Sequence, residues 1–227
     1  MEMEITLPTE IAVMTLPDMT FFPQALLPLH IFEARYQQML KESLASDRLF
    51  AVAGINSKQA KETGQFEPPH RVATIGIVRA CQKSENGTSN LLIQGLARVE
   101  IVEILSEQPF RRVRIKALSS APGADSEENL RLRQTLGKLL ATKQRLGGHI
   151  PREFTQFLKT VNDPETFVDL AAFTLCDDAR LKQKLLETLD VHARLQLYSK
   201  RLNREIETMK LQKKLQGRLS DDLIERN

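Results

Sequence analysis

The chain changes its amino-acid usage near residue 120, and this change restricts the folds open to it. Before residue 120, valine and isoleucine recur in short alternating runs; after it, leucine, lysine, arginine, glutamine and glutamate dominate. The first usage favours strands and the second favours helices. The join, Ser119–Asp125, has the composition of a linker or loop. We therefore predict an α+β chain with a β domain at residues 1–119 and a helical domain at residues 120–227.

The first domain contains six or seven short strand-like runs. Pro28 interrupts one run and makes it an edge strand or a bulged strand, because proline cannot donate to a ladder. Asn86-Gly87 is the preferred pair for a type I′ hairpin. Phe32–Leu44 has helical spacing of apolar residues, and Asn56–His70 is interpreted as a polar loop. The pattern predicts a closed or nearly closed barrel with strands at Ile11–Leu16, Ala25–Ile31, Arg48–Ile55, Arg71–Cys81, Ser89–Gln94, Arg98–Leu105 and Phe110–Leu118.

The second domain is predicted to be a helical bundle, because helix-start and helix-stop signals punctuate it. Gly147-Gly148 ends one helix, Asp163 precedes a first-turn proline, and Asp177 or Asp178 can cap the next helix. A long basic amphipathic helix follows Asp190 and closes the domain. The expected helices are Glu127–Gln144, Pro151–Thr160, Pro164–Leu175, Ala179–Leu189 and a last one from Val191 to about Leu215, with Leu219 as a further apolar position.

The charge of the chain is unevenly distributed. The formal net charge is +3, yet residues 194–218 hold eight Lys and Arg against two acids. A basic stretch on a helix is most often a solvated face. Its functional alternative is phosphate binding, which makes an RNA-binding protein the second hypothesis for this chain. The absence of tryptophan and an aromatic content of 5% argue against a base-stacking surface, so a nucleic-acid partner is disfavoured.

The sequence carries no recognisable catalytic or metal-binding motif. It lacks a P-loop, a dinucleotide-binding glycine loop and a nucleophile elbow. The two cysteines form no C-x-x-C pair, and the four histidines are too scattered to suggest zinc. We therefore expect no catalytic residue, no metal and no cofactor. No signal peptide or membrane-length apolar run is recognisable, so the default expectation is a cytoplasmic protein without a membrane partner.

Two pairs of ionisable residues admit a catalytic interpretation. His30 and Glu33 could form an acid–base pair, which would make an enzyme with an unrecognised site the third hypothesis. We favour a structural role, with His30 hydrogen-bonded where strand gives way to helix and Glu33 in the first helical turn. Glu33 and Arg35 can also pair with neighbouring loops. Asp177 and Asp178 are better explained as helix-capping residues than as paired carboxylates.

Two apolar features are candidate protein-binding sites. Phe21, Phe22 and Pro23 follow a turn signal; the phenylalanines either plug the barrel, which we favour, or grip a partner. The second feature is the apolar stripe of the last helix, which either packs inside the bundle or forms a coiled-coil or dimer seam. Its residues are Leu195, Tyr198, Leu202, Ile206 and Met209.

Four stretches in order resemble the Lon protease N-terminal, or substrate-binding, domain family. The first, Met14–Leu40, has a strand, a Leu-Pro turn, an aromatic-Pro pair and then Pro-Leu before a helix. Arg71–Gln82 is similar to a characteristic strand of the family. Asn90–Ile101 is similar to its V-x-G-x-x-R-V element, in which Gly95 also suggests a bulge or a close backbone approach. Leu185–Leu219 resembles the region where a leucine-rich segment precedes a long helix.

The resemblance implies a PUA-like β-barrel followed by a helical bundle. It implies a non-catalytic module that captures unfolded or client polypeptides, as this region does in full-length Lon, where it also supports hexamer assembly. The partners expected are such polypeptides, together with an ATP-dependent protease or a second copy bound through the last helix. The chain ends at Ser220–Asn227, before any ATPase or peptidase site, so peptidase activity is not carried over. The opening PLHIFEARY favours a free-standing form.

Overall fold

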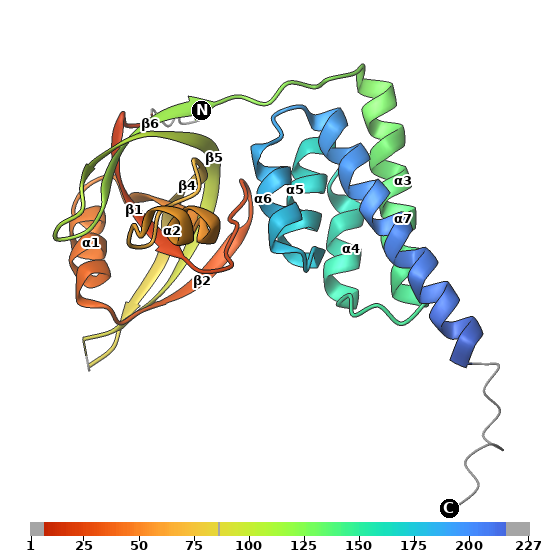
Figure 1. Ribbon diagram of the computed structural model, residues 1–227, viewed down its shortest axis with the longest axis horizontal. Helices are drawn as coiled ribbons and strands as arrows, with labels where there is room; N and C mark the ends of the chain where they lie inside the picture. Colours follow the sequence, from red (N-terminus) through yellow and green to blue (C-terminus); the bar gives the residue numbers. More distant parts are fainter. Residues whose placement is uncertain (1–6, 86, 217–227) are drawn as a thin grey trace, which may run out of the picture. The chain divides into compact units, whose positions relative to one another are not determined.

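The computed structural model describes residues 7–85 and 87–216, which form two compact units (Figure 1). The first unit consists of the chain up to Ser120 together with Asp169–Leu189. The second consists of Ala121–Val168 together with the chain from Asp190 on. The predicted domains, 1–119 and 120–227, differ from these units because Ser120 and residues 169–189 group with the β part.

The first unit contains one sheet that closes into a barrel. In the described part of the chain its order is β2-β5-β4-β3-β1-β6, and a further pairing of β5 with β6 joins the ends of the five-strand ring. Strands β1 and β3 are parallel, and every other pair is antiparallel. The barrel predicted from the strand pattern is thereby confirmed. The strands are β1 Glu10–Leu16, β2 Leu26–Ile31, β3 Leu49–Gly54, β4 Val72–Lys83, β5 Ser89–Ser106 and β6 Arg112–Leu118.

The barrel interior is filled by small and branched apolar side chains. Strand β3 is buried at all six positions, which explains its uninterrupted LFAVAG sequence. Among the described residues, strand β2 pairs only with β5, so Pro28 lies on an edge strand, one of the two placements predicted. The core consists of Ile11, Val13, Leu49, Ala51, Ala53, Ala73, Ile75, Val99, Ile101, Val113 and Ile115.

Strand β5 is longer than the sequence predicts. Two strands, Ser89–Gln94 and Arg98–Leu105, were expected, but the ladder runs on through Gly95. The amide of Gly95 donates to the carbonyl of Ala25 at 2.9 Å, and the amide of Gln24 donates to the carbonyl of Gly95 at 2.9 Å. A Cβ at Gly95 would collide with the carbonyl oxygen of Phe22. The predicted close approach of two backbones at this glycine is confirmed.

Two helices accompany the barrel strands. Helix α1 (Ala34–Leu44) begins two residues later than predicted, with Glu33 at its N-cap. Helix α2 (Ser57–Thr63) lies where a polar loop was expected, and that prediction is wrong. The side chain of Asn56 accepts from the amide of Gln59 at 3.1 Å, and Gly64 ends the helix with a φ of 69°.

The turn between β4 and β5 agrees with a hairpin. The amide of Ser84 donates to the carbonyl of Thr88 at 2.9 Å, and Gly87 has a φ of 83°. The predicted type I′ geometry also involves Asn86, which lies outside the described residues. The same holds for Leu219 as an extension of the last helix and for Ser220–Asn227.

Residues 169–189 join the first unit through a buried ion pair. They include the later part of α5 (Pro164–Leu175) and all of α6 (Ala179–Glu187). Arg98 on β5, only 2% exposed, donates to the carboxylate of Asp169 at 2.7 Å and to the carbonyl of Leu186 at 3.0 Å. The rings of Phe21 and Phe173 meet edge to face with centroids 6.1 Å apart. These contacts explain why a segment predicted for the helical domain belongs with the barrel.

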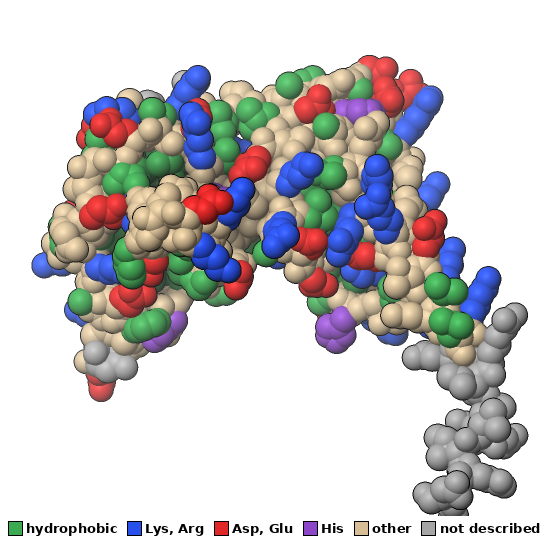
Figure 2. All heavy atoms as spheres, in the orientation of Figure 1, with side chains coloured by type: hydrophobic (Ala, Val, Ile, Leu, Met, Phe, Trp, Pro, Cys, Tyr) green, Lys and Arg blue, Asp and Glu red, His purple; other side chains and the backbone are tan. Residues whose placement is uncertain are grey.

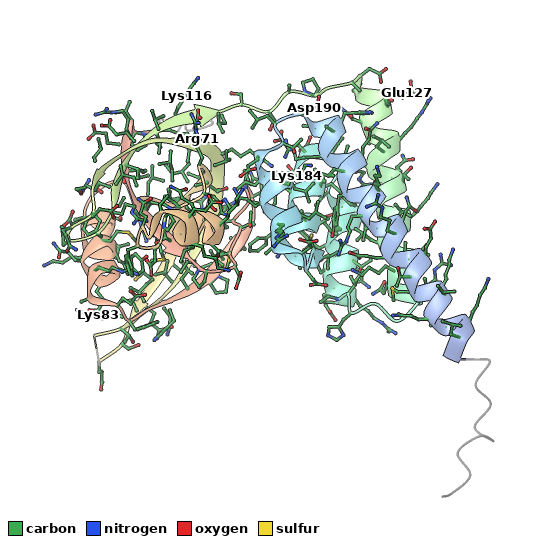
Figure 3. The ribbon with its side chains drawn as sticks, in the orientation of Figure 1. Arg71, Lys83, Lys116, Glu127, Lys184 and Asp190 are labelled. Carbon is green, nitrogen blue, oxygen red and sulfur yellow. The ribbon has the colours of Figure 1, made fainter. Side chains whose placement is uncertain are left out.

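The second unit is a helical pack in which α3 and α7 lie side by side (Figure 1). Its elements are α3 Ser126–Arg145, α4 Arg152–Thr160, the first turn of α5 and α7 Val191–Gln216. The predicted caps are present, since Asp163 accepts from the amide of Thr166 at 2.7 Å. Asp190, labelled in Figure 3, accepts from the amide of Ala193 at 2.8 Å and so starts α7.

Candidate functional site

The residues singled out for protein binding lie in two different units, and most of them are buried. Phe21 and Phe22 are 1% and 0% exposed, and Pro23 is partly exposed. Burial of the phenylalanines, the alternative favoured from the sequence, is confirmed. Buried rings offer no surface to a partner in this conformation.

The stripe on α7 packs mostly inside the second unit. Four of its members are buried, while Met209 is partly exposed. The described α7 residues that present large apolar side chains to solvent are instead Leu211 and Leu215, at 58% and 56% exposure. A seam through the stripe stays a prediction. The four buried members are Leu195, Tyr198, Leu202 and Ile206.

The His30–Glu33 pair is divided between different partners. The Nδ1 atom of His30 lies 2.7 Å from the side-chain oxygen of Asn90, across the β2–β5 pairing. Glu33 accepts from the guanidinium of Arg35 at 2.9 Å. The contacts fit a structural role for both residues, although the placement of Glu33 in the first helical turn is wrong, since it is the N-cap residue of α1. Cys81 and Cys176 are not joined in a disulfide, and the described residues contain no group of His, Cys, Asp and Glu able to hold a metal.

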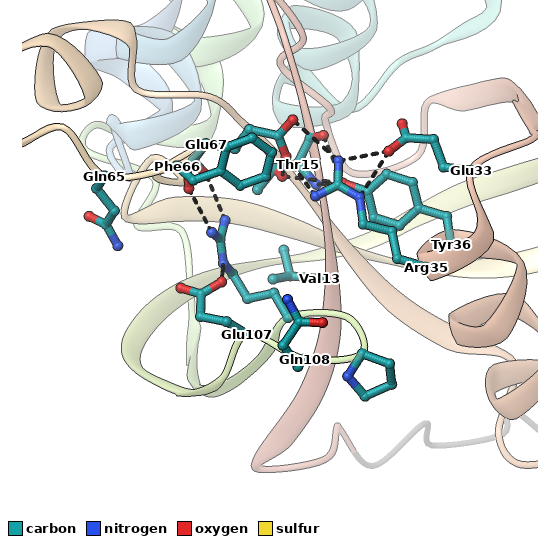
Figure 4. A pocket seen from close by; sticks show the side chains of 12 residues that line it. Val13, Thr15, Glu33, Arg35, Tyr36, Gln65, Phe66, Glu67, Glu107 and Gln108 are labelled. Atoms are coloured by element: carbon teal, nitrogen blue, oxygen red, sulfur yellow. Dashed lines mark hydrogen bonds and ion pairs between the residues drawn. The ribbon is translucent and has the colours of Figure 1, made fainter.

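The first unit contains a cavity of about 740 Å³, which we call the Phe66 pocket. It lies where β1, the start of α1, the segment after α2 and the segment before β6 meet (Figure 4). Its lining combines charged groups, ring faces and aliphatic surface. The lining residues are Val13, Thr15, Glu33, Arg35, Tyr36, Gln65, Phe66, Glu67, Glu107, Gln108, Pro109 and Arg111.

Arg35 occupies one side of the Phe66 pocket between two carboxylates. Its Nε donates to Glu33 at 2.9 Å, and its two terminal nitrogens contact Glu67 at 2.9 and 3.2 Å. Its guanidinium lies 4.4 Å from the ring centroid of Tyr36 and 5.5 Å from that of Phe66. Burial alone would lower the pKa of Arg35, but the hydrogen bonds to Glu67 and Glu33 outweigh it and raise that pKa. The cation is thus a fixed structural charge.

Arg111 holds the other side of the pocket in place. It is 7% exposed, and its Nε donates to Glu107 at 2.8 Å. Its terminal nitrogens donate to the carbonyls of Glu67 and Phe66 at 2.6 and 2.9 Å. Glu67 has a φ of 44°, in the left-handed region that non-glycine residues rarely adopt. Such strain persists only where the surroundings enforce it, and two carbonyl bonds to one guanidinium do so here.

The result is an exposed aromatic ring on a restrained backbone. Phe66 is 69% exposed, although the carbonyls of its own residue and the next are both bound. Tyr36 donates to the carbonyl of Thr15 at 3.1 Å and so fixes the opposite wall. Chemically, the pocket offers ring faces, an aliphatic floor and charged hydrogen-bonding groups, which suit the binding of a side chain from another molecule.

Sequence reasoning missed both Phe66 and Arg111. The sequence pattern predicts a polar loop at Asn56–His70, and the aromatic binding residues that it suggests are Phe21 and Phe22. One signal was available, since Phe66 is a lone aromatic in the polar run Gly64–Glu67 before two prolines. The expected pairing with a neighbouring loop is confirmed for Arg35, through Glu67, whereas Glu33 pairs with Arg35 itself.

The basic residues of α7 are partly neutralised within the second unit. Arg194 is fully buried and contacts Glu165 at 3.0 Å. Glu205 accepts from Arg201 at 2.6 Å and from Lys143 at 2.8 Å. On the face drawn in Figure 2, acidic side chains are interspersed among the basic ones of this unit. Fewer of these basic side chains are therefore available to bind phosphate than the charge count of residues 194–218 suggests. No helix among the described residues is long and apolar enough to cross a membrane.

Comparisons with known proteins point to one family. The model of the ATP-dependent protease La (LON) substrate-binding domain matches residues 10–204. The Lon protease of Syntrophus aciditrophicus is 29% identical over 220 residues, covering 96% of this chain and 28% of that protein. The Lon protease of Heliobacterium modesticaldum is 28% identical over 210 residues, covering 92% and 26%. The chain thus spans about a quarter of the length of these relatives.

Two solved structures share the fold. The N-terminal domain of the Mycobacterium avium complex Lon protease has a TM-score of 0.67 at 18% identity, covering 86% of this chain and 98% of that chain. The Lon N-terminal domain protein from Xanthomonas campestris has a TM-score of 0.59 at 17% identity, covering 83% and 96%. At these identities the likeness concerns the fold, a barrel with a helical part.

Proposed function

The chain belongs to the Lon substrate-binding domain family, and on this premise we propose that it is a non-catalytic module that binds unfolded or client polypeptides through the Phe66 pocket. The family match supports the recognition of substrates in general. The choice of surface and of unfolded polypeptide as the ligand are our proposals. An ATP-dependent protease is the downstream partner that we propose, because the relatives are such proteases.

The observation that carries the proposal is the exposure of Phe66 on a fixed backbone. An aromatic ring that is held rigid before binding loses little conformational freedom when a partner packs against it. Aromatic anchors beside a pocket are the residues in which binding energy concentrates. Phe66 combines 69% exposure with two backbone carbonyls bound to Arg111, and it lies on a cavity of about 740 Å³. An extended apolar segment could bury this ring and place one side chain in the cavity.

Replacing the ring tests the proposal. We expect Phe66→Ser to weaken binding of a fluorescently labelled, reduced and alkylated carrier protein about tenfold, because losing an anchor costs more than ~1 kcal/mol. Fluorescence anisotropy titrations would give the dissociation constants. Phe32→Ser is the matched control, since Phe32 is 65% exposed in the same unit and does not line the pocket. Equal affinity of the wild type and Phe66→Ser, or equal losses in both variants, would contradict this choice of surface.

A further inference from the structure

We propose that the Phe66 pocket selects polypeptide segments in which a lysine or arginine neighbours the apolar residue that the pocket takes up. This inference rests on the proposed function, because it specifies the ligand of the same site. The preference follows from the hydrogen-bonding groups of the pocket. Some of these groups already bind each other, and others can still bind a ligand.

Each guanidinium nitrogen in the pocket already has a partner. All three guanidinium nitrogens of Arg35 contact Glu33 or Glu67. All three of Arg111 contact Glu107 or the carbonyls of the Phe66–Glu67 segment. An acidic ligand would therefore have to share each guanidinium with the carboxylates or carbonyls that it already binds.

The carboxylates are only partly occupied. Glu67 uses both oxygens, which receive Arg35 and the hydroxyl of Thr15. Glu33 and Glu107 each use Oε2 alone, and among the described residues nothing donates to either Oε1. Their side chains are 40% and 50% exposed, so these oxygens are within reach of a ligand. Figure 4 shows Glu33 at the right of the labelled group and Glu107 at the lower left, with the Phe66 ring at the upper left.

The charge balance points the same way. The lining contains three glutamates and two arginines, a formal charge of −1. A ligand that brings N–H donors and positive charge complements two open acceptors, whereas an acidic ligand meets a lining of net negative charge whose two guanidinium groups are already engaged. The aliphatic stem of a lysine or arginine can lie along the Phe66 ring while its head reaches Glu33 or Glu107.

Three labelled peptides test the inference on the full chain. They share one length and one central Phe-Leu pair, which is flanked by lysine, glutamine or glutamate. In anisotropy titrations at low salt we expect the lysine peptide to bind about tenfold tighter than the glutamate peptide, with the glutamine peptide between them. The difference should shrink at higher salt, because the carboxylates are half-exposed.

Variants of the open carboxylates connect the preference to the pocket. In Glu33→Gln/Glu107→Gln the affinities for the lysine and glutamate peptides should converge to within about twofold. Glutamine keeps an oxygen for the arginine, so the fold should survive, and circular dichroism checks it. Glu107→Gln alone, at a half-exposed position, should narrow the preference and serves if the double variant does not fold. Glu42→Gln is the control, because Glu42 is also half-exposed and arginine-paired but lies outside the pocket.

The outcomes separate the inference from the proposed function. Equal, Phe66-dependent binding of all three peptides would overturn the charge preference and leave the polypeptide-binding function standing. A lysine preference that survives in the glutamine variants, or that disappears equally in Glu42→Gln, would also overturn it. No binding of any peptide or of the alkylated carrier protein would overturn the proposed function and the inference together.

Discussion

Breaking the ion pair between Arg98 and Asp169 should destabilise the first unit more than breaking any surface pair. Both side chains are 2% exposed and lie 2.7 Å apart. We consider Asp169→Ala, which leaves the Arg98 guanidinium buried beside the carbonyl of Leu186 and the ring of Phe22. Arg98→Met is the reciprocal change, which leaves the carboxylate buried without its cation.

The magnitude follows from what remains buried after each change. Removing one member of a buried pair typically costs about 3–5 kcal/mol, because the partner keeps its desolvation penalty without its compensation. Arg98→Met also removes the bond to Leu186, about 1.5–3 kcal/mol for a bond from a charged donor, so we place it at the upper end. By contrast, Arg131→Ala should cost less than about 1 kcal/mol, since Arg131 and Glu127 are 73% and 75% exposed.

Urea denaturation followed by far-ultraviolet circular dichroism would measure these free energies of unfolding, as the chain has no tryptophan. Hydrogen exchange would locate the effect. Amides in 169–189 should lose protection in Asp169→Ala, whereas those of α3 should keep theirs, because only the former segment depends on the pair. The double variant Arg98→Met/Asp169→Leu should recover about 2 kcal/mol or more relative to the sum of the single changes.

Losses below about 1 kcal/mol in both single variants would refute the argument, since they would mean that the buried charges are compensated elsewhere. Strict additivity in the double variant would refute it too. Either result would remove the ion pair as the reason why residues 169–189 join the barrel.

Two further predictions concern other contacts. Gly95→Ala should destabilise the first unit by about 1–3 kcal/mol, measured by urea denaturation, because its Cβ would collide with the carbonyl of Phe22; an unchanged midpoint would refute the tight approach. Burial alone would raise the pKa of Glu205, but hydrogen bonds from Arg201 and Lys143 outweigh it and lower that pKa below 4.5. A carboxylate with a lowered folded pKa contributes stability that is present above its unfolded pKa and is lost as pH falls through the folded pKa. The gap in stability between wild type and Glu205→Gln should therefore narrow as pH falls below about 4.5, as pH-dependent thermal unfolding would show; a constant gap would contradict this.

Much of the fold could be predicted because it depends on local pattern. Alternating apolar runs gave the strands, the aspartates at 163 and 190 marked helix starts, and Pro28 marked the sheet edge. Helix α2 was not predicted because none of its residues is buried. It therefore lacks the apolar periodicity by which the other helices were recognised. Its end signals, Asn56 and Gly64, were present in the sequence.

The candidate site could not be predicted because it depends on contacts between distant parts of the chain. Arg111 binds backbone carbonyls of residues 44 and 45 positions earlier. Nothing local to Arg111 indicates that it would be 7% exposed. Conversely, Phe21-Phe22 is conspicuous in the sequence, yet tertiary packing buries both rings. Local pattern gives the elements, whereas exposure is decided by what the completed fold covers.

The chain passes from one unit to the other after Ser120, Val168 and Leu189. Neither unit is therefore one uninterrupted stretch of sequence. A single cut in the Ser119–Asp125 join would leave two fragments that together still contain every residue of both units. The barrel fragment would lack residues 169–189, which belong to the same unit. It would have to bind them from the other fragment through the Arg98–Asp169 ion pair and the Phe21–Phe173 ring contact. The architecture thus has the logic of a split protein, in which two pieces complement each other without a covalent bond.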